Sequence, residues 1–134
     1  MTTIRVPDES QVSAEVGEVF ADIRRAFGMS FVPNLFKVMA YNPAYLKANW
    51  ERVKIIMGPG LIERKTKEMI AVAVSATNGC DYCVNAHTAA LKAMGVGDAE
   101  LVELMAVVDL FSGFNKLLEG LQVTSDIGVG SRAS

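Results

Sequence analysis

The feature that most constrains the fold is an Asn78–Gly79 pair between two segments of helical pattern. The segment before it, from about Arg64 to Ala76, is apolar almost all round, which is typical of a central buried helix. The segment after it continues in helical spacing to about Met94. Asparagine and glycine commonly end helices and form tight turns. We therefore expect two helices that fold back on each other.

The N-terminal half also has a helical pattern. Asp8, with Gln11 three residues later, resembles a capping box, and apolar residues then recur at helical spacing from Val12 to Phe27, where Gly28 offers a stop. A turn at 31–34 leads into a short helix through Leu35, Phe36 and Met39. Asn42–Pro43 is a start signal for a further helix that reaches Met57.

The last helix, capped by Asp98, carries two apolar stripes. We expect one stripe to face the core of the chain and the other to face a second subunit. The first stripe consists of Leu101, Met105, Val108, Phe111 and Leu118, and the second of Val107, Leu110, Phe114, Leu117 and Leu121.

No segment shows the sustained alternation of a β-strand. The expected fold is therefore all-α, with five or six helices in one oligomeric domain that spans residues 1–134. Residues 1–9 and 124–134 are expected to be extended or frayed.

Both cysteines and the only histidine of the chain lie together in the segment Cys80-Asp-Tyr-Cys83-Val-Asn-Ala-His87. On a helix, this spacing places the three side chains within an arc of about 60°. Two sulfurs this close can form a disulfide. A histidine one turn beyond Cys83 can accept its proton, and the helix N-terminus favours a thiolate. The pattern predicts a thiol redox centre.

A histidine that acts as a base needs a group that orients it, usually a carboxylate. Glu68 is the candidate, because it lies about as far before Asn78 as His87 lies after it. Two antiparallel helices would bring the two side chains together. A carboxylate in so apolar a helix also requires a partner.

Other interpretations of the motif are weaker. A zinc site would have two sulfurs and one nitrogen, one ligand short of a closed site, although a carboxylate or water could complete a catalytic one. A thioredoxin-like site would need βαβ elements, which the pattern lacks. The cysteines could also be small buried hydrophobes, and His87 a core histidine. We expect a centre without a metal or cofactor.

Composition excludes several classes of function. The net charge is −2, and the densest basic run, 64–67, lies between two glutamates, so a nucleic-acid-binding surface is not expected. The longest apolar run, Met69–Val74, is far shorter than the ~18 residues of a membrane span. The N-terminus lacks the apolar stretch of an export signal, so a cytoplasmic, reducing location is expected. The hydrophobic share of 51% favours self-association.

The spacing Glu68, Cys80-x-x-Cys83-x-x-x-His87 resembles that of the alkylhydroperoxidase D-like / carboxymuconolactone decarboxylase family. The segments from Val32 to Pro43 and around Phe111–Asn115 resemble its peroxidase-related members.

The resemblance implies an all-helical protein that assembles as trimers or hexamers. It also implies a hydroperoxide reductase with a peroxidatic Cys83, a resolving Cys80, a relaying His87 and an ionised Glu68. A dithiol or a lipoylated protein would be the reductant. The decarboxylases of the family lack the cysteine pair, which argues against their activity here. Two alternatives stay open: a thiol redox sensor on the same scaffold, or a decarboxylase-like enzyme.

Overall fold

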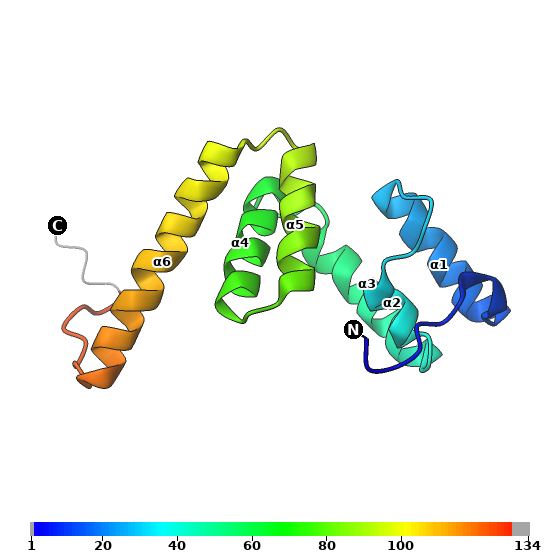
Figure 1. The fold of residues 1–134 in the computed structure, drawn as a ribbon, viewed down its shortest axis with the longest axis horizontal. Coiled ribbons are helices and arrows are strands. Elements are labelled where there is room, and N and C mark those ends of the chain that lie inside the picture. The colour runs from blue at the N-terminus through cyan, green and yellow to red at the C-terminus, as the bar shows by residue number, and fades with distance from the viewer. Residues whose placement is uncertain (1, 130–134) are drawn as a thin grey trace. The chain divides into compact units, whose positions relative to one another are not determined.

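A computed structural model describes residues 2–129, which contain helices and no strands (Figure 1). The predicted all-α fold is therefore confirmed. The elements are a short 3₁₀ helix η1 (Glu9–Gln11) and the α-helices α1 (Ala14–Phe27), α2 (Asn34–Met39), α3 (Pro43–Met57), α4 (Arg64–Thr77), α5 (Asp81–Ala93) and α6 (Asp98–Gly120). Two compact units divide the chain, one up to Gly60 and one from Leu61 onward. The single domain stays a prediction.

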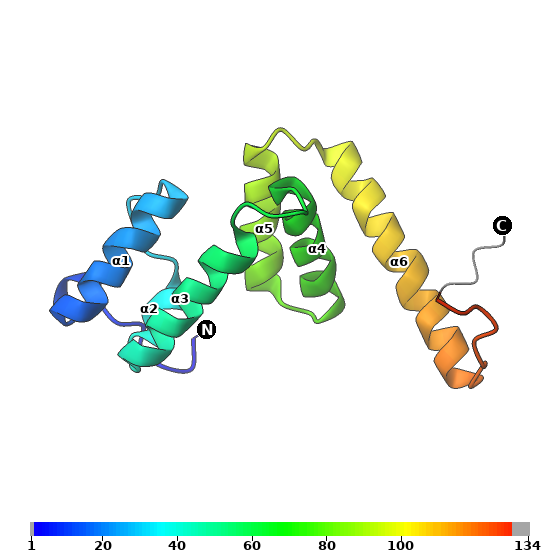
Figure 2. The same ribbon diagram turned by 180° about the vertical axis from the view of Figure 1, so that it is seen from behind.

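The first unit packs α1 against α3, with α2 beside them (Figure 2). Its core consists of Val16, Phe20, Ile23, Val32, Phe36, Leu46 and Trp50. The Trp50 indole stacks edge-on against Phe36 and donates a hydrogen bond to Asp22 at 2.7 Å. Because its one polar atom is satisfied, Trp50 serves as core.

The first helix starts later than expected. Asp8 caps η1 by accepting from the Ser10 amide, and α1 has its own N-cap, Ser13, which accepts from the Val16 amide. The proposed Asp8–Gln11 capping box is therefore wrong. The Asp8 carboxylate accepts from the amide and the hydroxyl of Ser10 and closes a short turn before α1 begins. The Asn42 cap of α3 is confirmed, since its side chain accepts from the Tyr45 amide.

In the second unit, α4 and α5 form an antiparallel hairpin (Figure 1). The turn between them is a Schellman motif: the Cys80 amide donates to the Ser75 carbonyl, and the Gly79 amide to the Ala76 carbonyl. Gly79 has φ +70°, a left-handed conformation that a side chain disfavours. The Asn78–Gly79 break thus folds the chain as predicted and joins Ser75 directly to the first cysteine.

The core of the second unit contains Val72, Leu91 and Val96, with Met69, Leu101 and Leu104 packed against it. Only one face of α4 lies in this core. Ile70 and Val74, on another face, are about half exposed, so the expectation that α4 is buried all round is wrong for this chain alone.

Helix α6 begins after Gly97, whose amide donates to the Glu100 carboxylate, so Asp98 is its first residue and not its cap. It packs on α4 through Leu101 and Leu104, and none of its residues is fully buried. The expectation that a whole stripe faces the core is therefore wrong: Phe111 and Leu118 of the first stripe are about as exposed as Leu110 and Phe114 of the second.

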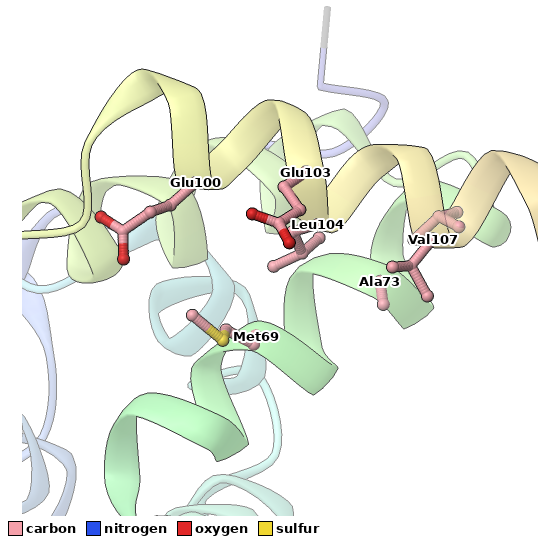
Figure 3. Close-up of a pocket in the computed structure, with 7 residues that line it drawn as sticks. Met69, Ala73, Glu100, Glu103, Leu104 and Val107 are labelled. Carbon is pink, nitrogen blue, oxygen red and sulfur yellow. The ribbon is translucent and has the colours of Figure 1, made fainter.

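A shallow groove of about 360 Å³ runs beside the contact between α4 and α6, lined by Met69, Ala73, Glu100, Glu103, Leu104, Val107 and Val108 (Figure 3). Met69 and Ala73 lie on a different face of α4 from Glu68 and Ser75, since they are offset by about a quarter turn or more. This groove is therefore separate from the candidate site described below.

Residues 124–129 follow α6 without regular structure, as expected, while 130–134 lie outside the described residues. Within the described part of the chain, none of the helices has the length and apolar character needed to cross a bilayer.

Candidate active site

The two cysteines lie at the first turn of α5, and both are free thiols. Cys80 is the N-cap, and its Sγ accepts a hydrogen bond from the Cys83 amide at 3.3 Å. A sulfur thus takes the place of the oxygen that usually caps a helix, where the helix dipole favours negative charge. Both side chains are partly exposed, so small molecules can reach them.

The pKa of the Cys83 thiol is raised above its ordinary value. The main cause is its hydrogen bond with Cys80, followed by partial burial and by charge repulsion from the Cys80 sulfur. A hydrogen bond with the Ser75 side chain opposes this shift. We expected the helix end and His87 to lower the Cys83 pKa. That expectation is wrong for the reduced pair, because the neighbouring sulfur and partial burial raise the Cys83 pKa.

On the neighbouring helix α4, the Glu68 carboxylate is buried, with 1% of the residue exposed. His87 Nδ1 lies 2.6 Å from its Oε2, and Arg64 donates to Oε1 from Nε at 2.8 Å, with its terminal nitrogen at 2.7 Å. The structure therefore brings Glu68 and His87 together, as the register of the two helices predicted.

Burial raises the pKa of Glu68, but the hydrogen bonds from His87 and Arg64 outweigh burial, so the net shift is downward. Glu68 is therefore ionised at neutral pH and accepts from both neighbours. With Nδ1–H donating to the carboxylate, the neutral imidazole has its lone pair on Nε2. The His87 side chain is 34% exposed, so the imidazole is partly open to solvent.

The structure does not join the two halves of the predicted site directly. Within residues 2–129, no hydrogen bond connects His87 to the sulfur of Cys80 or Cys83. Cys83 and His87 are one helical turn apart on the same face of α5, a spacing of about 6 Å between Cβ atoms. One water molecule could bridge such a gap. In the same part of the chain, no three side chains of the metal-ligating types lie close enough to hold a metal ion.

Two residues of the site were missed in the sequence. Arg64 precedes Glu68 by four residues, a spacing that favours an ion pair on a helix and could have indicated it. Ser75 is a hydroxyl on the apolar face of α4 and is only 8% exposed. Because a buried hydroxyl needs a hydrogen-bond partner, its place among apolar residues could have marked Ser75 as a candidate. Nothing in the sequence identified Cys83 as that partner.

Replacing Glu68 with glutamine should lower the free energy of unfolding by about 1–3 kcal/mol at pH 7, since two charge-assisted hydrogen bonds are weakened. Because the folded pKa of Glu68 is depressed, its stabilising effect is present above the ordinary value of 4.5 and is lost as the pH falls below it. The difference from the wild type should therefore shrink at acid pH. Urea unfolding at several pH values measures this.

The matched control is Glu18→Gln, the same change at an exposed position of α1, which should alter stability little. Equal stability of Glu68→Gln and wild type at pH 7 would contradict the buried network.

Comparison with known proteins assigns the chain to a family. Residues 43–126 match the model of the carboxymuconolactone decarboxylase family. An alkyl hydroperoxide reductase of Mycobacterium tuberculosis is 36% identical over 83 residues, which are 62% of this chain and 24% of that protein. This chain thus spans about a quarter of that relative's length. The alkyl hydroperoxide reductase AhpD of Mycobacterium marinum is 28% identical over 131 residues, covering 89% of this chain and 73% of that protein.

The fold agrees with the crystal structure of an alkylhydroperoxidase AhpD core from Rhodospirillum rubrum. The TM-score is 0.88 at 41% sequence identity, and the match covers 94% of this chain and 95% of that one. The matched family model extends over more than half of the chain. The chain therefore belongs to the carboxymuconolactone decarboxylase family, in which it has an alkylhydroperoxidase D-like fold.

Proposed function

We propose that the protein is a thiol-dependent hydroperoxide reductase that uses Cys83 and Cys80, with Glu68 and His87 as a proton relay. The observation that carries this proposal is a pair of accessible thiols at a helix N-terminus, one turn from a histidine held by a buried carboxylate. The names of the relatives, alkyl hydroperoxide reductases, support the same class of substrate.

The first step is attack of Cys83 on the peroxide. Because Cys80 raises the Cys83 pKa, Cys83 is mostly protonated at neutral pH and needs a base. His87 Nε2 takes the thiol proton through one water molecule, while Glu68 stabilises the resulting imidazolium. The thiolate attacks one peroxide oxygen and the O–O bond breaks. The departing alkoxide takes the proton back from His87, and Cys83 is left as a sulfenic acid.

The second step forms the disulfide. The Cys80 sulfur attacks the Cys83 sulfenic acid, a sulfur–sulfur bond forms, and water leaves. Two cysteines three residues apart at the start of a helix are close enough for this bond. An external dithiol, free or carried on a lipoylated protein, then supplies two electrons and two protons to restore both thiols. This cycle requires a reducing compartment such as the cytoplasm.

The proposal predicts that Cys83→Ser abolishes peroxide consumption with a dithiol donor. Without the donor, Cys80→Ser should still consume about one peroxide per chain and then stop, because nothing reduces the sulfenic acid back to the thiol. Peroxide consumption measured against enzyme concentration distinguishes the two variants. Reversible oxidation of the wild-type pair without turnover would contradict the reductase and support a thiol redox sensor.

We also propose that the protein is a homo-oligomer, a trimer or a hexamer, through the C-terminal half of α6. From just before the middle of α6 to the residue after its end, large apolar side chains are about half exposed or more: Val107, Leu110, Phe111, Phe114, Leu117, Leu118 and Leu121. So many large apolar groups on one helix exceed what a monomer usually exposes. A second copy of the chain would cover them.

A carboxylate placed in this surface should break the assembly. Phe114→Glu should reduce the molar mass measured by light scattering at micromolar concentration, because the charge would be buried without a partner. Ser112→Glu is the control, since it adds the same group on another side of the same helical turn. A wild-type protein that is monomeric at this concentration would refute the proposed interface.

A further inference from the structure

Cys83 is in contact with the preceding helix as well as with its own. Ser75 lies on the face of α4 that packs against α5, and its side chain is hydrogen-bonded to the Cys83 sulfur. The Ser75 carbonyl accepts from the Cys80 amide at 2.9 Å in the α4–α5 turn. One residue therefore contacts both cysteines, one through its side chain and the other through its backbone.

We propose that the Ser75 hydroxyl is a positioning residue that donates to the Cys83 sulfur and stabilises the negative charge there. This inference rests on the proposed function and extends it, because it names a group that helps Cys83, the proposed attacking sulfur, to ionise. Ser75 is only 8% exposed, so its hydroxyl is largely shielded from bulk water and a hydrogen bond to the sulfur meets little competition from solvent.

The two sulfurs have different donors. Cys80 Sγ accepts a hydrogen bond from the Cys83 amide, which is fixed by the helix backbone. Cys83 Sγ is hydrogen-bonded to the Ser75 hydroxyl, which can rotate. When Cys83 is a thiol, the hydroxyl proton makes a weak bond, and when Cys83 is a thiolate the bond becomes charge-assisted. The hydrogen bond thus favours the ionised form of Cys83.

The test removes this hydroxyl in a chain that has a single thiol. In a Cys80→Ser background, Cys83 is the only cysteine, so the rate of alkylation by iodoacetamide reports its ionisation alone. Adding Ser75→Ala should move the half-point of the alkylation profile to higher pH. At pH 7 the rate should fall about tenfold, the effect of losing one hydrogen bond to a charged group.

Two further variants separate this role from a structural one. Thr77→Ala removes a hydroxyl two residues later in α4, which bonds the Ala73 carbonyl, and should leave the profile unchanged. Ser75→Thr keeps the hydroxyl and should restore most of the rate. An unchanged profile in Ser75→Ala, or a loss in Ser75→Thr as large as in Ser75→Ala, would overturn the proposal.

Alkylation needs no peroxide, so the outcome does not depend on peroxidase activity. A shifted profile in a protein that turns over no peroxide would keep the role of Ser75 and refute the reductase. Normal peroxide turnover by the wild type, together with an unchanged alkylation profile in Ser75→Ala, would keep the reductase and refute the role of Ser75.

Discussion

The second unit depends on a carboxylate that is buried between two helices. Glu68 could not be ionised there unless its charge were paired, and a lone buried charge would cost several kcal/mol. His87 from α5 and Arg64 from the first turn of α4 supply the pairing. Because one partner lies on each helix, the pair holds the hairpin in one register. The same register brings Ser75 against Cys83 at the other end of the hairpin.

The chemistry of the site follows from two opposing effects. A neighbouring sulfur raises the pKa of Cys83, and a hydrogen bond with Ser75 opposes that shift. In the proposed mechanism, the His87–Glu68 pair removes the proton. The thiol would then stay protonated until His87 accepts its proton. The arrangement also keeps a second sulfur close enough to form a disulfide with the first. All of these residues lie on the α4–α5 hairpin.

Much of this hairpin could be predicted from the sequence. Helical periodicity gave the ends of α4 and α5 to within a residue or two, and the distance from Glu68 to Asn78 was enough to expect its contact with His87. The start of α1 was mispredicted, because Asp8 and Ser13 are both good caps and sequence alone does not choose between them. The direction of the Cys83 pKa was also mispredicted, since it depends on the hydrogen bond between two sulfurs, which spacing does not reveal.

The apolar stripes of α6 show a different limit. Periodicity placed the apolar residues of α6 in two stripes, but it could not say what covers them. Within the described residues, most of these side chains are exposed. Burial against another copy leaves the same pattern in a sequence as burial against the chain's own core.

The central claim is that the His87–Glu68 pair removes the proton from Cys83 during attack on a peroxide. The most direct measurement is the single-turnover rate of sulfenic acid formation at Cys83, followed by mass spectrometry in a Cys80→Ser background with and without His87→Gln. The account predicts a rate about a hundredfold lower in the glutamine variant at neutral pH, with recovery at alkaline pH where the thiol ionises unaided. Equal rates in the two proteins across the whole pH range would contradict it.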